Sequence, residues 1–328
     1  MLDFLRKILI FEKILMLMKK NFAAALLSAV MVLGCIGAKA QTVTKSNEFS
    51  NFTCIEASSD FEIVIKTGST CKAEWIVDQM IEDLVQIYQK GNTLIVAFDQ
   101  KSMTKDQKKY YKGKNAPKKI LKATIYTPDL ETLKVKDNVH VDASGATFDS
   151  KEFTLSMEDE TTVNTLTVRA KSVFVETSDK AVANVSAEAP KVAVKSNKSS
   201  RANVNLTGCE TVEVKSDNSC IVDISGNANS VDIQNFGSSK VIVEKGSATS
   251  ITITSKDSTF GSDPEVDATA YTVENAYVSM AGGKAYVNAS KILKLDLKSG
   301  SLVSFMDDPS VEIVKVEKST ITHYNGKK

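Results

Sequence analysis

The feature that most constrains this chain is a short alternating pattern that recurs about every 20 residues over its C-terminal two-thirds. In the unit Glu210–Ala228, two apolar pairs, Val212/Val214 and Val222/Ile224, are separated by the polar corner KSDNS. Successive units are 19 to 22 residues apart, a spacing typical of solenoid repeats. Their first apolar residues are Leu133, Phe153, Val173, Val192, Val212, Val231, Ile251, Tyr271, Leu293 and Ile313.

Each unit of this repeat can form strands with one apolar face. Alternate side chains of a strand point to the same side, so the two apolar residues of each pair point inward. One unit cannot bury that face alone, whereas stacked units bury a continuous core. The repeat therefore predicts an all-β fold, a single-stranded β-helix of about ten coils over residues 130–328.

The polar corners and one irregular stretch complete the predicted repeat. The serine and asparagine residues at the corners are expected to stack as polar ladders along the solenoid, and they include Ser196, Asn197, Ser216, Asn218 and Ser238. Distortions are expected at residues 259–265, where Pro264 breaks a strand, and in the enlarged unit after Tyr271.

Residues 1–40 have the features of an export signal. Two lysines precede the apolar run 22–32, and a small-x-small sequence ends at Ala40. We expect cleavage between Ala40 and Gln41, which leaves no transmembrane span in the mature chain. Residues 1–17 are interpreted as an upstream extension, because Met18 begins a complete signal by itself.

Two alternatives to this signal remain open. The N-terminal residues can form one longer amphipathic or membrane helix. The sequence before Cys35 also resembles a lipobox, so lipidation of Cys35 is a less favoured alternative to cleavage after Ala40. In each case the rest of the chain is expected to be exported, to the periplasm, the outer-membrane surface or the medium.

Residues 41–129 are less regular than the repeats that follow. Alternation predicts strands at 61–65, 73–77 and 93–98, and the spacing of apolar residues in 79–89 predicts a helix. A solenoid exposes its core at each end, so this region is predicted to cap the N-terminal coil.

The stretch 101–122 has a strongly basic composition, with nine lysines and one acidic residue. One hypothesis is a binding patch for an anionic surface such as lipopolysaccharide or acidic glycan. The favoured alternative is a solvated loop between two strands. The candidate binding residues are Lys108, Lys109, Tyr110, Tyr111 and Lys112.

The four cysteines after Gln41 give no sign of a metal site, since none forms a Cys-x-x-Cys or Cys/His cluster. Export permits disulfides, and Cys54 and Cys71 flank one strand and can pair. Cys209 and Cys220 are expected to be buried packing residues. No cofactor is expected, and a formal net charge of +1 gives no electrostatic case for nucleic acid.

The acidic residues of the chain bear on whether it is an enzyme or a binding protein. β-Helices include polysaccharide lyases and hydrolases, and glycoside hydrolysis needs carboxylates clustered at a defined separation. The chain's acidic residues recur at corners, where aspartate favours turns for backbone reasons. Asp217 and Asp223 are the pair whose substitution would test catalysis. We favour a protein that is not an enzyme, with a carbohydrate-active, pectinase-like enzyme as the alternative.

Several short sequences together resemble one bacterial family, the putative autotransporter adhesin, head GIN domain. They are Phe52-x-x-Ile55, Asp60-Phe61-x-Ile63, Gly91-Asn92-Thr93-Leu94-x-Val96, Ile125-Tyr126-x-Pro128-x-Leu130 and the valine-rich coils as in 212–224. The resemblance covers nearly all of 51–326 and implies a right-handed β-helix, a Gram-negative exported setting and an adhesive role. It supplies no catalytic residues.

The resulting functional hypothesis is an adhesin-like protein that binds glycan or protein at the cell envelope. A structural envelope protein without a soluble ligand is a further alternative. The oligomeric state is left open.

Overall fold

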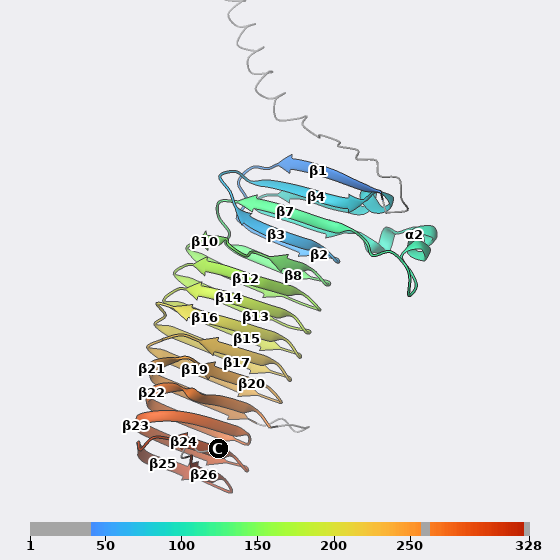
Figure 1. Cartoon of the computed structure of the whole chain (residues 1–328). Helices are drawn as coiled ribbons and strands as arrows, with labels where there is room; N and C mark the ends of the chain where they lie inside the picture. Colours follow the sequence, from blue (N-terminus) through green and yellow to red (C-terminus); the bar gives the residue numbers. More distant parts are fainter. Residues whose placement is uncertain (1–40, 257–262, 325–328) are drawn as a thin grey trace, which may run out of the picture.

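The computed structural model describes residues 41–256 and 263–324 of the chain. These residues form an elongated stack of β-strand coils (Figure 1), an all-β solenoid of about nine turns. The fold expected from the repeat is therefore confirmed.

Most of the described residues lie in strands. In chain order the elements are β1 (Thr42–Glu48), β2 (Cys54–Ser58), β3 (Glu62–Thr67), β4 (Lys72–Asp78), the 3-10 helix η1 (Gln79–Leu84), β5 (Val85–Lys90), β6 (Thr93–Phe98), η2 (Gln100–Ser102), α2 (Lys105–Tyr110), β7 (Leu121–Thr127), β8 (Thr132–Lys136), β9 (His140–Asp142), β10 (Thr147–Asp149), β11 (Glu152–Met157), β12 (Thr162–Arg169), β13 (Ser172–Thr177), β14 (Val182–Glu188), β15 (Lys191–Asn197), β16 (Arg201–Thr207), β17 (Thr211–Asp217), β18 (Ile221–Ser225), β19 (Ser230–Phe236), β20 (Lys240–Glu244), β21 (Gly246–Lys256), β22 (Glu265–Ala281), β23 (Lys284–Lys298), β24 (Leu302–Met306), β25 (Ser310–Val316) and β26 (Thr320–His323).

Parallel pairing joins each strand to its counterpart one coil away and so makes two ladders. The first ladder runs β6–β2–β8–β11–β13–β15–β17–β19–β21 and continues into the second halves of β22 and β23 and into β25. The second ladder runs β7–β3–β9–β12–β14–β16–β18–β20 and continues into the first halves of β22 and β23, β24 and β26. The connections between the ladders form the corners.

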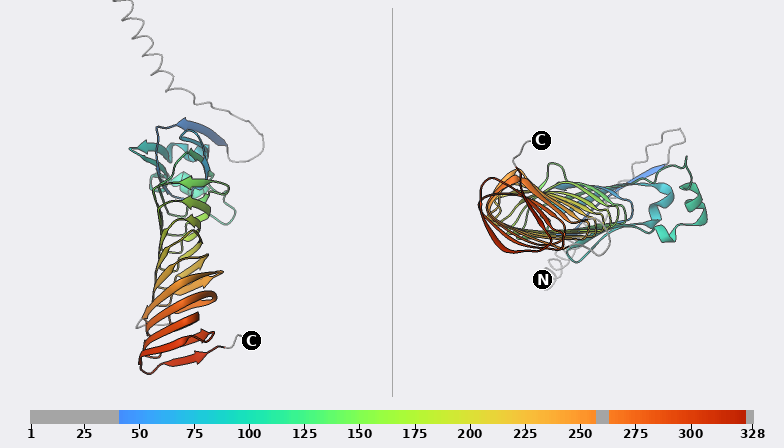
Figure 2. Two further views of the ribbon diagram at one scale, coloured as in Figure 1. Left: turned by 90° about the vertical axis from the view of Figure 1, so that its left-hand side faces the viewer. Right: turned by 90° about the horizontal axis from the view of Figure 1, so that it is seen from below.

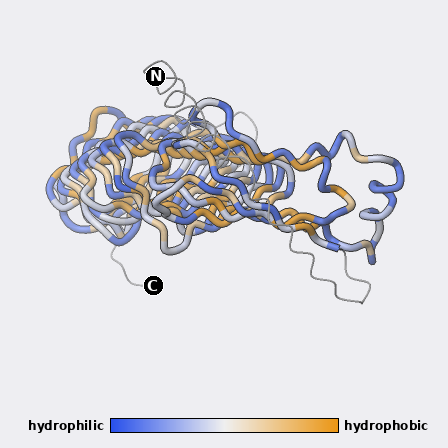
Figure 3. Tube along the Cα trace, turned by 90° about the horizontal axis from the view of Figure 1, so that it is seen from above, coloured by the Kyte–Doolittle hydropathy of each residue, from blue (hydrophilic) through white to orange (hydrophobic). Residues whose placement is uncertain are grey.

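The core lies between the two ladders and consists of columns of apolar residues. Val192 pairs with Val212, and Val212 with Val231, and all three are at most 2% exposed. Figure 3 looks along the stack and shows hydrophobic and hydrophilic residues alternating round the coils. This alternation is what burying one face of each strand requires.

The spacing of the repeat placed three residues in the wrong register. Leu133 pairs with Leu155 rather than Phe153, and Ile313 pairs with Leu295 rather than Leu293. A shift of two residues keeps the same face inward, so the pattern of alternation cannot reveal it. Tyr271 pairs with Gly246, because the connection after β21 is longer than those of the neighbouring coils.

The polar ladder expected at the corners is present and partly buried. Thr177 Oγ1 lies 2.7 Å from Ser196 Oγ, and Ser216 Oγ donates to Asn235 Oδ1 at 2.7 Å. All four residues are at most 1% exposed, so these bonds satisfy polar groups that water cannot reach. Part of the irregular stretch expected at 259–265 lies outside the described residues, but β22 begins directly after Pro264 as expected.

The N-terminal end of the stack is closed by antiparallel strands. β5 pairs with β6, β4 pairs with β7, and β1 covers β4. The helix expected at 79–89 is found only over 79–84, as a 3-10 helix, and is wrong over 85–89, which lie in β5. In β5, Val85 and Ile87 face the same side, so a period of two replaces the helical one.

The other end of the stack lacks such a cover in the described part of the chain. Inward positions of β25 are exposed there, and Ile313 is 62% exposed. Leu295, its partner one coil earlier, is 0% exposed. Burial in a solenoid thus depends on having a coil on both sides.

Candidate binding sites

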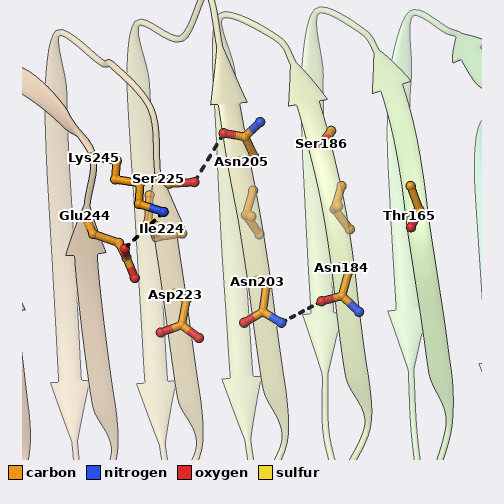
Figure 4. A pocket seen from close by; sticks show the side chains of 12 residues that line it. Thr165, Asn184, Ser186, Asn203, Asn205, Asp223, Ile224, Ser225, Glu244 and Lys245 are labelled. Atoms are coloured by element: carbon orange, nitrogen blue, oxygen red, sulfur yellow. Dashed lines mark hydrogen bonds and ion pairs between the residues drawn. The ribbon is translucent and has the colours of Figure 1, made fainter.

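A shallow pocket of about 330 Å³ lies on the outer surface of the second ladder, across strands β12 to β20. Except for the buried Val185, Val204 and Ile224, its lining residues alternate with the core positions, so their side chains point outward (Figure 4). We call this surface the polar face. It is lined by Thr165, Asn184, Val185, Ser186, Asn203, Val204, Asn205, Asp223, Ile224, Ser225, Glu244 and Lys245.

One column of the polar face carries amide and carboxylate groups. Asn184, Asn203 and Asp223 are paired in register on β14, β16 and β18. Asn203 Nδ2 donates to Asn184 Oδ1 at 2.6 Å. Arg201 closes the column, with its Nε 3.1 Å from Asn203 Oδ1 and its Nη2 2.5 Å from Asp223 Oδ2.

A second column runs beside the first, two residues further along each strand. Ser186, Asn205 and Ser225 are paired in register, and Ser225 Oγ donates to Asn205 Oδ1 at 3.2 Å. Asn205 is exposed, and the two serines are half-buried. The two columns therefore present short groups that both donate and accept hydrogen bonds.

Sequence analysis did not single out the polar face. Its signal was visible, because VANVS, RANVN and IVDIS place short polar residues at the same phase of successive units. The predictions concerned the corners and the acidic residues and did not include these outward positions. Asp223, considered earlier as a catalytic acid, lies on this face in an ion pair with Arg201.

The candidate residues of the basic stretch lie in the connection between β6 and β7. We call residues 99–120 the lysine-rich lobe. It extends sideways beyond the outline of the stacked coils (Figure 2). Lys108, Lys109 and Tyr110 lie on α2, followed by Tyr111 and Lys112. The lobe is ordered into a short helix rather than being a plain loop.

Tyr111 differs from the other candidate residues of the lobe because it points back into the protein. Its hydroxyl donates to Asp78 Oδ2 at 2.5 Å, and Asp78 is 3% exposed. Burial, together with the bond to Asp78, raises the pKa of Tyr111 above its usual value. Tyr111 thus anchors the lobe, whereas Lys108, Lys109, Tyr110 and Lys112 are exposed.

A disulfide between Cys54 and Cys71, which the sequence permits, is not formed, and both are free thiols. The sulfur of Cys71 is buried 3.7 Å from Thr127 Oγ1, whereas that of Cys54 lies 3.6 Å from Asn92 Nδ2 on the outer side. The two thiols belong to different environments because Cys54 begins β2 and Cys71 precedes β4. Cys209 and Cys220 are buried, as expected.

The N-terminal signal, metal binding and membrane spans are the remaining features predicted from the sequence. Cys35 and Ala40 lie outside the described residues, and Gln41 is the first residue described. Within 41–256 and 263–324, no three His, Cys, Asp or Glu side chains are arranged to hold a metal ion. No helix in that part of the chain is long and apolar enough to cross a membrane.

The fold and its polar outer face define a β-solenoid protein. A family model described as "Putative auto-transporter adhesin, head GIN domain" matches residues 51–219, just over half of the chain. The chain belongs to this family, as the resemblance of its short motifs indicated. No match was found among curated proteins.

Solved structures of similar proteins include putative adhesins and a putative lipid binding protein. A putative adhesin from Parabacteroides merdae is 16% identical, with 87% of this chain and 96% of that chain covered and a TM-score of 0.49. A putative adhesin from Bacteroides fragilis is 15% identical, with 87% and 98% covered and a TM-score of 0.35. A putative lipid binding protein from Parabacteroides distasonis is 15% identical, with 87% and 97% covered and a TM-score of 0.40. At these values the likeness carries no argument about a ligand.

Proposed function

We propose that this chain is an exported, non-enzymatic, adhesin-like protein that binds neutral glycan at the cell envelope through its polar face. The observation that carries the proposal is the pair of columns formed by short polar side chains across neighbouring coils. Membership of the adhesin family supports a role in binding external molecules. The export signal expected in residues 1–40 supports a site of action outside the cytoplasm.

The chemistry of the polar face suits sugar hydroxyl groups. A sugar hydroxyl donates one hydrogen bond and accepts others, and asparagine and serine side chains do both. Neighbouring coils are about 4.8 Å apart, so short polar groups recur at a regular interval along these columns. An extended, repetitive ligand can therefore meet the same partners several times.

The acidic groups of the polar face favour binding over hydrolysis. Glycoside hydrolysis needs one carboxyl group to give a proton and a second to act as base or nucleophile. Asp223 Oδ2 is held by Arg201 at 2.5 Å, and Glu244 lies 3.9 Å from Lys245 Nζ. Each of these carboxylates is paired with a cation, whereas hydrolysis needs two carboxyl groups that face one bond of the substrate.

The proposal is tested with a glycan array at low and at physiological salt. The protein is residues 41–328, which contain every element of the described fold. We expect saturable binding to a defined class of neutral glycan at both salt concentrations. The double variant Asn184→Ala/Asn203→Ala should weaken it at least tenfold, because two amides that would bond to sugar hydroxyls are lost, at about 1 kcal/mol each.

A matched control removes two amides from the other ladder. Gln234 is exposed on β19, and Asn275 lies on β22. Gln234→Ala/Asn275→Ala should leave glycan binding unchanged. Absence of binding to any neutral glycan would overturn the proposal and favour a structural envelope protein. Turnover of a bound glycan that Asp217→Asn and Asp223→Asn abolish would favour an enzyme.

A further inference from the structure

The lysine-rich lobe concentrates positive charge in one part of the molecule. Residues 99–120 contain eight lysines and two aspartates, a net charge of +6, whereas the whole chain has a net charge of +1. Lys119 pairs with Asp60. In the described part of the chain no carboxylate lies within 4 Å of the ammonium groups of the other seven. These are Lys101, Lys105, Lys108, Lys109, Lys112, Lys114 and Lys118.

The lobe is held in place despite this charge. Thr104 and Gln107 form a capping box at the start of α2. The side chain of Gln107 also donates to the carbonyl of Met80 at 2.6 Å, and Tyr111 is bound to Asp78. Three contacts thus fix a short helix that could not persist alone in water.

The arrangement of lysines on α2 is unfavourable for the isolated protein. Lys105 and Lys109 are four residues apart, and Lys105 and Lys108 three apart, so these like charges are neighbours on the helix surface. Like-charge pairs at these spacings destabilise a helix. An anionic surface against α2 removes that repulsion, so the free lobe is better matched to a polyanion than to water.

The type of cation narrows the choice of polyanion. Arginine binds discrete carboxylates through its planar fork, whereas lysine is a flexible point charge. The lobe contains lysine alone, and the described part of the chain has only Arg169 and Arg201. Flexible point charges suit a dense anionic surface without fixed geometry, such as a bilayer of anionic lipids.

Exposed amphipathic side chains beside the lysines fit the same surface. Tyr110 is 40% exposed at the end of α2, and Met80, whose carbonyl binds Gln107, is 44% exposed. Tyrosine is favoured at the level of lipid headgroups, where one side of its ring is apolar and its hydroxyl stays wet. In Figure 2 the lobe projects clear of the stack, so a flat surface can reach it.

We propose that the lysine-rich lobe docks the protein onto the anionic headgroups of a lipid bilayer. This site is separate from the polar face, and its occupant differs in chemistry. The bilayer attracts the lobe through its surface charge, and Tyr110 and Met80 lie at the headgroup level. The stack is then held at its N-terminal end, with the polar face of β12–β20 beyond the docking site.

The test measures binding of residues 41–328 to sedimented vesicles. Vesicles of phosphatidylcholine mixed with phosphatidylglycerol are compared with vesicles of phosphatidylcholine alone. We expect binding to the anionic vesicles only, and weaker binding as salt screens the charges. Each lysine near an anionic bilayer is worth about a fivefold change in affinity, so Lys108→Gln/Lys109→Gln/Lys112→Gln should weaken binding by about a hundredfold.

A matched control changes the same charge on the stack. Lys151, Lys171 and Lys191 are exposed on three neighbouring coils. Lys151→Gln/Lys171→Gln/Lys191→Gln should change vesicle binding by less than threefold, and far-ultraviolet circular dichroism should show that both variants remain folded. Binding of neutral glycan by the lobe variant should be unchanged, so failure here is distinct from failure of the polar-face proposal.

Three results would overturn the docking proposal. The lobe variant would bind anionic vesicles as tightly as the unmodified chain, or the control would lose as much affinity. In the third, vesicles would not bind while an acidic polysaccharide such as heparin bound in a manner that needs the lobe lysines. That outcome would reassign the lobe to acidic glycan.

Discussion

The stack and the lysine-rich lobe differ in how far their cationic side chains are paired with carboxylates. In the stack, many cations pair with carboxylates one coil away, as in Lys195–Glu176 at 2.5 Å. Arg169 lies between two coils and binds Asp149 at 2.8 Å and Glu188 at 2.9 Å. In the lobe, seven lysines lack such partners among the described residues.

The difference follows from the repeat. Every outward position in the stack lies beside its counterpart in the next coil, so a cation at one position has a neighbour at a fixed place that can be acidic. The lobe replaces an ordinary corner between β6 and β7 and has no counterpart in other coils. The lysines of the lobe therefore have no acidic neighbours supplied by an adjacent coil. They remain available to bind an anionic ligand.

The largest effect on the free energy of unfolding is expected from truncating a buried side chain in the core of the stack. Ile233 and Ile313 belong to one column of the first ladder, but Ile233 is 0% and Ile313 is 62% exposed. Ile233→Ala should lower the free energy of unfolding by about 2–5 kcal/mol, whereas Ile313→Ala should cost far less. Urea denaturation followed by circular dichroism measures both. Equal losses would contradict the stacking account of burial.

Alkaline pH is expected to weaken the stack at Tyr271. Burial raises the pKa of Tyr271 to about 12, and its hydroxyl donates to the carbonyl of Ser247 at 2.9 Å. The neutral phenol is favoured in the folded state, so its contribution is full below pH about 10 and is lost between pH 10 and 12. The loss should be about 2 kcal/mol.

Tyr271→Phe should remove this part of the alkaline loss. Tyr277 lies in the same strand and is 37% exposed, so Tyr277→Phe should leave the loss in place. The measurement is the urea midpoint as a function of pH. A Tyr271→Phe variant that keeps the full alkaline loss would rule out this origin.

The anchor of the lobe offers a smaller and more local effect. Tyr111→Phe leaves Asp78 buried without its phenol partner, which should cost about 1–3 kcal/mol of local stability. Amide hydrogen exchange should become faster in residues 100–112 and remain unchanged in β13–β19. Tyr110→Phe is the control, because that ring is exposed. Equal effects of both variants would show that Tyr111 is not the anchor.

The smallest effect is expected at the surface ion pairs of the stack. Arg201 and Asp223 pair across neighbouring coils with 48% and 16% of their side chains exposed. Arg201→Gln should lower the free energy of unfolding by about 1 kcal/mol or less, and high salt should reduce the difference. Thermal unfolding at low and high salt measures it. A loss of several kcal/mol would mean that the pair is a structural requirement of the stack.

The sequence allowed the solenoid to be predicted because one period recurs many times. The register between neighbouring coils was harder to predict. A shift of two residues at Leu133 or Ile313 leaves every apolar side chain facing inward. The strand at 85–90 was missed because Met80, Leu84, Ile87 and Tyr88 fit helical spacing, whereas only Val85 and Ile87 show the alternation. Antiparallel pairing with β6 decides between the two, and that contact is not local.

The candidate sites were predictable to different degrees. The basic composition of the lobe can be read directly from the sequence. The inward orientation of Tyr111 cannot, because it depends on a contact with Asp78, 33 residues earlier. The polar face could be predicted only by aligning successive repeat units and comparing the residues at the same position of each. Cys54 and Cys71 are near in sequence, yet the strands place one thiol outward and the other in the core.

The most direct test of the central claim is one experiment with two ligands and two variants. Residues 41–328, the lobe variant and the Asn184→Ala/Asn203→Ala variant are each titrated with a neutral glycan and with anionic vesicles. The account predicts that the lobe variant loses vesicle binding alone and that the polar-face variant loses glycan binding alone. If either variant loses both activities, or neither loses any, the stack and the lobe do not act as independent binding surfaces.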